Sequence, residues 1–191
     1  DTTALERDLV GLGLELVDAP VSGGVKRAVD GSLSIMAGGP AERVARARPI
    51  LAAMGKSIIH AGPIGAGHAM KALNNYVSAA GLVAACEALQ VGERFGIDPN
   101  VMTDVFNVST GRNNSTEVKL KPFIIPRRYD SGFAMALMAK DLGIAADLAE
   151  GLGLDLPQIG AVARLWAQAS AALGPGADHP EIARHLAGET G

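Results

Sequence analysis

Apolar and polar residues follow two different patterns along the chain, and the change falls near residue 66. Before it, short apolar runs at 14–20, 32–39 and 57–60 alternate with helix-like stretches at 2–14 and 40–55. Short apolar strands that alternate with helices are typical of an α/β layer. We therefore predict an α/β fold for this first part.

From residue 68 onward the pattern is helical throughout. One run extends from His68 to Phe95, where Gly96 is expected to end it. At about 1.5 Å per residue such a helix is roughly 40 Å long, which suits a helix that joins two domains. Asp98 and Pro99 are a cap and a first helical residue. They open a series of helices expected at 99–109, 115–121, 133–150, 157–173 and 180–187.

These patterns predict an α/β domain at 1–66, and an interdomain helix with an all-helical domain at 67–191. Net charge is −3, and the lysines and arginines are scattered, so the basic face that nucleic acid requires is not expected. The apolar stretch 69–92 contains Lys71 and Glu87 among other polar residues, which argues against a membrane span. No secretory signal is recognised, and the predicted location is the cytoplasm.

The cysteine and histidine residues argue against a disulfide framework and against a zinc site. The single cysteine, Cys86, lies in an apolar helix, so we expect a buried, inert thiol and no disulfide framework. His60, His68, His179 and His185 lack the spacing of metal ligands, and no zinc site is expected.

The stretch GPIGAGHAMKALNN, residues 62–75, carries the first candidate chemistry. Gly62, Gly65 and Gly67 form G-x-x-G-x-G, the reverse of the dinucleotide fingerprint, and Lys71 stands too far from them for a Walker loop. The glycines are expected to let the backbone turn tightly and approach a ligand closely.

Lys71 is expected in the first turn of the long helix, where the helix dipole disfavours a cation. Asn75 and Ser78 share its face, while the other faces carry Ala, Leu and Val. Dipole and burial both favour a neutral amine, which can exchange a proton near neutral pH. The alternative is a lysine that extends its ammonium to solvent, with asparagines that bond a neighbouring helix.

Two further motifs flank this stretch. DAPVSGG at 18–24 ends a predicted strand, and backbone N–H groups in such a turn form an anion site to which the Ser22 hydroxyl can add a donor. The alternative there is an ordinary strand-to-helix turn. In the third motif, Lys140 and Asp141 stand in an apolar helix, where an exposed salt-bridging pair is the simpler interpretation.

In this order and spacing, the three motifs resemble the β-hydroxyacid dehydrogenase family, which includes 3-hydroxyisobutyrate dehydrogenase. The family shows D-A-P-V-S-G-G, then G-x-x-G-x-G-x-x-x-K-x-x-x-N, then K-D-L, and this chain matches all three. The resemblance implies that Ser22, Gly23 and Gly24 hold a substrate carboxylate. It also implies Lys71 as general acid/base and Asn75 as a catalytic residue that hydrogen-bonds the substrate and fixes the geometry of that lysine. Lys140 is implied to lie beside the nicotinamide of NAD or NADP.

The resemblance implies an oxidoreductase that interconverts a small 3-hydroxy acid and its semialdehyde. The family's N-terminal G-x-G-x-x-G half is absent from this sequence. We therefore expect the tail of a Rossmann domain, the interdomain helix and the helical domain, in a chain that by itself binds NAD(P)H weakly or not at all. Two alternatives stay open: a catalytically silent helical module for dimerisation or ligand binding, and a 6-phosphogluconate-type dehydrogenase.

Assembly follows from the apolar character of the later helices. The stretch 133–152 carries more apolar residues than one helix stripe accounts for, and the long helix is similar between Val77 and Leu89. A homo-oligomer, dimer or tetramer, packed through these helices is expected, and two-fold dimers are the commonest closed form.

Overall fold

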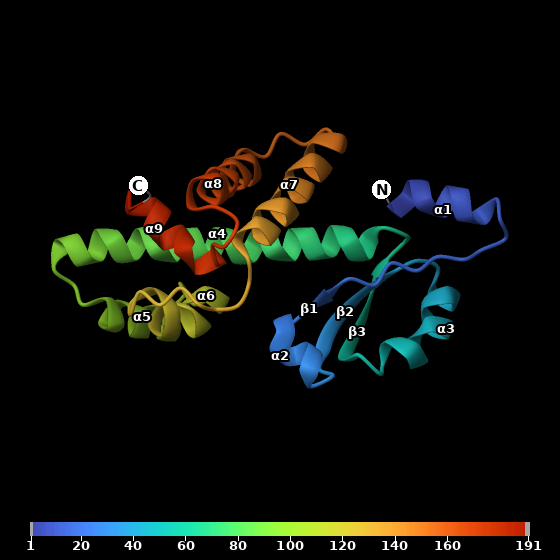
Figure 1. Cartoon of the computed structure of the whole chain (residues 1–191), viewed down its shortest axis with the longest axis horizontal. Coiled ribbons are helices and arrows are strands. Elements are labelled where there is room, and N and C mark those ends of the chain that lie inside the picture. The colour runs from blue at the N-terminus through green and yellow to red at the C-terminus, as the bar shows by residue number, and fades with distance from the viewer. Residues whose placement is uncertain (1, 190–191) are drawn as a thin grey trace. The chain divides into compact units, whose positions relative to one another are not determined.

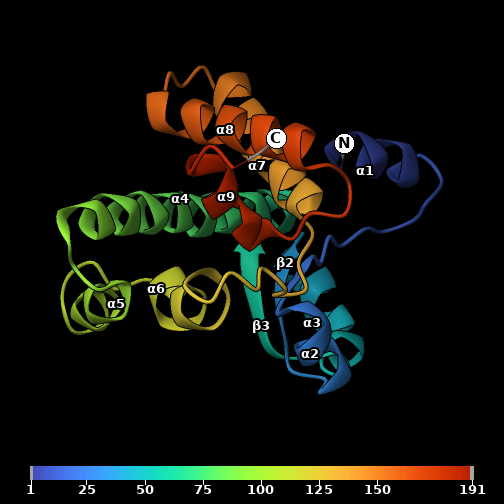
Figure 2. The ribbon, with the colours of Figure 1, turned by 60° about the vertical axis from the view of Figure 1, so that its left-hand side comes forward.

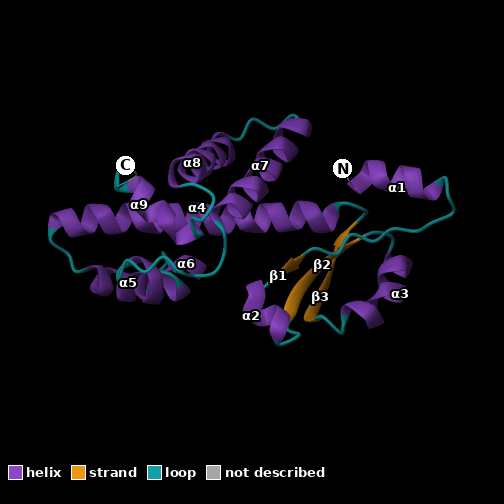
Figure 3. Ribbon diagram, viewed as in Figure 1, coloured by secondary structure: helices purple, strands orange, loops and turns teal. Residues whose placement is uncertain are grey.

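The computed structural model describes residues 2–189, and the chain divides into two compact units, Asp1–Leu73 and Asn74–Gly191. All strands in the described part of the chain lie in the first unit, as Figure 3 shows. The long helix α4, Ala66–Phe95, begins in the first unit and continues as the first helix of the second. The predicted fold class, an α/β remnant followed by an all-helical part, is confirmed.

A three-stranded mixed sheet forms the centre of the first unit (Figure 1). Strand β2 lies in the middle, antiparallel to β1 and parallel to β3. The elements of this unit before α4 are α1 (Thr2–Val10), β1 (Val21–Ser22), α2 (Gly24–Val29), β2 (Leu33–Gly38), α3 (Ala41–Leu51) and β3 (Gly55–Gly62). Its core consists of Leu33, Ile35, Ala37, Val44 and Leu51, which join the central strand to α3.

The strand predicted at 14–20 is wrong in its bounds. Only an isolated bridge, Asp18 to Gly38, falls in that range, and the regular strand β1 begins at Val21. Pro20 explains the gap, because it accepts a hydrogen bond from Met36 N–H but has no N–H to donate to the ladder.

The second unit is helical in all its described elements. After α4 come α5 (Pro99–Val108), α6 (Asn114–Val118), the π-helix η1 (Leu120–Ile124), α7 (Met135–Gly151), α8 (Pro157–Leu173), the 3₁₀ turn η2 (His179–Glu181) and α9 (Ile182–Leu186). Figures 1 and 2 both show α7 and α8 side by side. Fully buried side chains of this core include Leu82, Leu120, Met135, Leu142 and Trp166.

Local residues set the start of α5 and the end of α6. Asp98 caps α5 by accepting from Asn100 N–H and Val101 N–H, at 2.8 and 3.2 Å, as the sequence predicts. The helix predicted at 115–121 is wrong at its end, because α6 stops at Val118 and a π-helix follows. Pro122 lies inside that π-helix, and its missing N–H prevents the ordinary helical hydrogen bond there.

Cys86 is a buried free thiol, as expected, and burial raises its pKa to about 12. The structure describes no group of three or more His, Cys, Asp or Glu side chains that could hold a metal ion. Among the helices of residues 2–189, none has both the length and the apolar character needed to cross a bilayer.

Candidate functional site

The turn at Ser22–Gly24 links β1 to α2 through two glycines. Gly23 has φ 138° and Gly24 has φ 63°, values that favour glycine over other residues. A Cβ at Gly23 would lie 2.6 Å from Cδ of Arg27, so a side chain is excluded by space as well. Within the described residues no side chain caps the start of α2, and Gly24 is exposed. The turn therefore leaves its backbone donors available to a ligand.

The glycine turn before α4 is filled from within the protein. Gly62 and Gly65 have φ 138° and 86°, which makes the tight turn that the sequence predicts. The carboxylate of Asp18 accepts hydrogen bonds from Gly65 N–H at 2.7 Å and His68 N–H at 2.9 Å. The third glycine, Gly67, approaches Asp18 and the β2 backbone closely. The N-terminus of α4 thus already binds an anion, which belongs to this chain.

Lys71 lies in the second turn of α4, because the helix begins at Ala66 rather than near His68. The prediction that it stands in the first turn is therefore wrong. The carboxylate of Asp18 accepts hydrogen bonds at the N-terminus of α4, which is the positive end of the helix dipole. Lys71 is half-buried, and no hydrogen bond or ion pair of its ammonium occurs among the described residues. It is a partly enclosed amine whose donors remain available.

Asn75 follows Lys71 by one helical turn and is held by a residue far along the chain. Its Nδ2 donates to Asp141 Oδ2 at 2.7 Å, and the other oxygen, Asp141 Oδ1, lies 3.1 Å from Lys140 Nζ. The side chain of Asp141 is 7% exposed, whereas that of Lys140 is 60% exposed. The exposed salt bridge predicted for this pair is therefore wrong for Asp141, which is buried.

Sequence reasoning missed the orienting role that this geometry gives to Asp141. A signal was present, because α7 buries Met138, Leu142, Ala145 and Ala149, and Asp141 falls on the same face. A carboxylate on a buried helix face needs partners, since an unpaired buried charge is costly. Asn75 and Lys140 are those partners.

A second titratable cluster, also missed, joins Lys119 to His179 and Asp178. Lys119 Nζ lies 2.5 Å from His179 Nε2, and His179 Nδ1 lies 3.1 Å from Asp178 Oδ1. Burial and the neighbouring Lys119 lower the pKa of His179 to about 4, so the imidazole is neutral at pH 7. Burial also lowers the pKa of Lys119. Because Asp178 accepts from Gly132 and Phe133 N–H groups, the cluster anchors the segment before α7.

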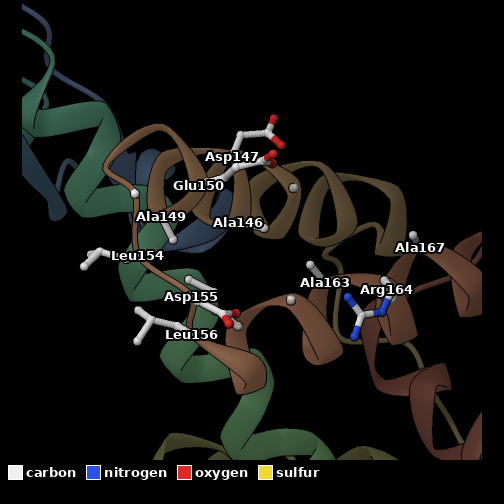
Figure 4. Close-up of a pocket in the computed structure, with 14 residues that line it drawn as sticks. Ala146, Asp147, Ala149, Glu150, Leu154, Asp155, Leu156, Ala163, Arg164 and Ala167 are labelled. Atoms are coloured by element: carbon white, nitrogen blue, oxygen red, sulfur yellow. The ribbon is translucent and has the colours of Figure 1, made fainter.

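A groove of about 650 Å³ lies between α7 and α8 (Figure 4). Small residues such as Gly143 and Ala163 line much of it, and Asp147, Asp155 and Arg164 are among its charged residues. The residues that the sequence analysis assigns to the site do not line it. Its carboxylates and single guanidinium offer no amine or imidazole for proton transfer.

The start of α4 is not open to the diphosphate of a dinucleotide. The sequence has no G-x-G-x-x-G turn, and the α4 N-terminus is occupied by Asp18. The side chain of Lys140 is largely exposed, although its ammonium lies 3.1 Å from Asp141 Oδ1.

Family models match both parts of the chain. Residues 65–186 match the family model described as "NAD-binding of NADP-dependent 3-hydroxyisobutyrate dehydrogenase". Residues 1–62 match the model described as "NAD binding domain of 6-phosphogluconate dehydrogenase". The 3-hydroxyisobutyrate dehydrogenase of Pseudomonas aeruginosa is 43% identical, over 83% of this chain and 56% of that protein.

Solved structures agree with the family models. The Mycobacterium tuberculosis 3-hydroxyisobutyrate dehydrogenase with L-serine superposes with a TM-score of 0.88 at 33% identity, covering 97% of this chain and 65% of that one. Psf3 in complex with NADP⁺ and 2-OPP superposes with a TM-score of 0.81 at 25% identity, covering 97% and 64%. The chain spans 56% of the length of its P. aeruginosa relative. It belongs to the 3-hydroxyisobutyrate dehydrogenase family of NAD(P)-binding oxidoreductases.

Proposed function

We propose that this chain carries the substrate-binding and proton-transfer residues of an NAD(P)-dependent oxidoreductase that interconverts a small 3-hydroxy acid and its semialdehyde. The observation that carries the proposal is Lys71, a half-buried amine without a partner among the described residues, followed one turn later by Asn75. Asn75 is itself oriented by the buried Asp141. L-serine, present with the M. tuberculosis relative, is a 3-hydroxy acid and supports this substrate class.

In this proposal each motif has one task. The Ser22 hydroxyl and the N–H groups of Gly23 and Gly24 bind the substrate carboxylate, because the turn leaves its donors uncapped. Asn75 hydrogen-bonds the substrate oxygen beside Lys71. Lys140, whose side chain is 60% exposed, lies beside the nicotinamide end of the cofactor.

Lys71 moves the proton. In oxidation its neutral amine takes the proton of the substrate hydroxyl as the oxygen becomes a carbonyl, and in reduction its ammonium returns that proton to the oxygen. The nicotinamide cofactor, when bound, accepts or supplies the hydride. The same lysine serves both directions, because the proton that leaves in one is the proton added in the other.

We further propose that residues 1–66 form part of the NAD(P)-binding domain, and that 67–191 form the interdomain helix and the helical domain. The family-model matches to 1–62 and 65–186 support a boundary near this point. A 6-phosphogluconate-type dehydrogenase is less favoured, because a substrate phosphate would need more basic residues than the exposed pair Lys26 and Arg27.

The direct test is turnover of a 3-hydroxy acid. The assay uses the 191-residue chain and a chimera. The chimera joins this chain to the part of the P. aeruginosa relative that lies outside the matched stretch, and it is called the completed enzyme below. We expect the completed enzyme to form NAD(P)H with 3-hydroxyisobutyrate or L-serine, and not with 6-phosphogluconate. Oxidation of 6-phosphogluconate alone would favour the second dehydrogenase class, and a folded, cofactor-binding chimera inactive on all three would favour the silent helical module.

We also propose that the chain forms a homo-oligomer, a dimer or tetramer, through its helices. Part of the apolar surface noted in the sequence is covered within the chain, since Met138 and Leu142 are buried. On α4, however, Val77 and Val91 remain 69% and 71% exposed. With the exposed Ala84 between them they recur every seven residues, the spacing of a helix-packing seam.

Light scattering at micromolar concentration is expected to give a mass of at least twice 19.5 kDa. Val91→Glu should reduce that mass to the monomer's, because a carboxylate in an apolar helix contact is desolvated without a partner. The matched control is Val29→Glu, at a similarly exposed valine of α2 outside this seam. A wild-type mass of 19.5 kDa would refute the oligomer.

A further inference from the structure

Asp18 connects the two elements that carry the proposed chemistry of the first unit. Its backbone pairs with Gly38 of β2, with hydrogen bonds of 3.1 Å and 2.7 Å, just before β1 leads into the Ser22 turn. Its carboxylate binds Gly65 N–H and His68 N–H at the start of α4. One residue thus links the chain four residues before Ser22 to the helix three residues before Lys71.

Two glycines, Gly38 and Gly67, make room for the Asp18 carboxylate because they have no side chain. A Cβ at Gly67 would lie 2.7 Å from Asp18 Oδ2, and a Cβ at Gly38 would lie 2.9 Å from Asp18 Cγ. Neither glycine has a positive φ, so space and not backbone conformation requires them. The side chain of Asp18 is 1% exposed. Within the first unit, Asp18 therefore packs closely against both β2 and the first turn of α4.

This contact differs from an ordinary helix cap. Asp98 caps α5 through N–H groups two and three residues away, and it closes only its own helix. Asp18 reaches N–H groups 47 and 50 residues away, so its bonds define tertiary structure. The carboxylate also occupies the N-terminus of α4, which would otherwise attract anions close to Lys71.

We propose that Asp18 is a positioning residue that sets Lys71 relative to the carboxylate-binding turn. This inference rests on the proposed function of Lys71 and Ser22. The side chain of His68 also contacts this carboxylate, since its Nδ1 lies 3.4 Å from Asp18 Oδ2. The same nitrogen lies 3.0 Å from Thr2 Oγ1. Small displacements of a proton-transfer group can lower turnover about 10²-fold while binding persists.

The test is Asp18→Asn in the completed enzyme, with Asp98→Asn as the matched control at the helix cap remote in sequence from the site. Asparagine has the size of aspartate but only one side-chain acceptor oxygen, so one of the two N–H groups loses its partner. We expect kcat to fall about 10- to 100-fold in Asp18→Asn, with KM for the 3-hydroxy acid changed less than about threefold. Asp98→Asn should retain kcat.

Amide exchange in the 191-residue chain gives a second readout, since Gly65 or His68 N–H should exchange faster in Asp18→Asn. Asp18→Ser, which removes the charge without added bulk, replaces it if Asp18→Asn does not fold. Equal kcat values for the Asp18 and Asp98 variants, with Lys71→Ala inactive, would overturn the positioning role and leave the proposed function intact. Full activity of Lys71→Ala would instead overturn the proposed function and the positioning role with it.

Discussion

Lys71→Ala is expected to lower kcat of the completed enzyme by at least ~10², the usual contribution of a general acid/base. KM for the 3-hydroxy acid should change less than about threefold, because the carboxylate is bound at the Ser22 turn and the lysine acts in the transition state. The measurement is steady-state formation of NAD(P)H with varied hydroxy acid at saturating cofactor.

Lys56→Ala is the matched control. Lys56 is an exposed lysine of β3 in the same unit, so the charge change is identical while the proposed chemistry is untouched. Its kcat should equal that of the wild type. Near-wild-type turnover in Lys71→Ala would show that the proton is transferred by another group, and the proposed mechanism would be withdrawn.

Trp166→Ala is expected to cost about 3–5 kcal/mol of unfolding free energy, the range for a large aromatic residue removed from a core. Trp166 is fully buried on α8, and it packs within the cluster that joins α4, α7 and α8. The space it leaves cannot close completely, since the surrounding helices are fixed by their other contacts. Urea unfolding at one protein concentration measures the change.

Two controls separate the cavity from the loss of the indole N–H. Trp166 Nε1 makes no hydrogen bond in the described structure, so Trp166→Phe removes an unsatisfied donor while keeping most of the volume. Trp166→Phe should stay within about 1 kcal/mol of the wild type, because the two effects oppose each other. Val108→Ala, at an exposed site of α5, should change stability by less than about 0.5 kcal/mol. A small loss for Trp166→Ala would mean that the helices close over the space.

Helix ends that depend on neighbouring residues could be predicted from the sequence, whereas strand bounds could not. The end of α4 at Phe95 and the start of α5 at Pro99 follow the predicted positions, because Gly96 and Asp98 act through their own backbone and near neighbours. The bounds of β1 were missed, since a strand needs a partner that donates and accepts along its whole length. Pro20 removes one donor, and its effect depends on pairing with β2.

The sequence by itself determined the long helix α4, the start of α5, the co-linear motifs around Ser22, Lys71 and Lys140, and through these motifs the family. These features depend on the spacing of residues along the chain, and that spacing can be read from the sequence alone. Only the tertiary structure decided that Asp18 fills the start of α4 and that Asp141 is buried against Asn75. Each of these contacts joins residues 47 to 66 positions apart, and no local pattern specifies which distant donor a carboxylate will meet. The partner follows from how the elements pack, and so it is known only once the chain is folded.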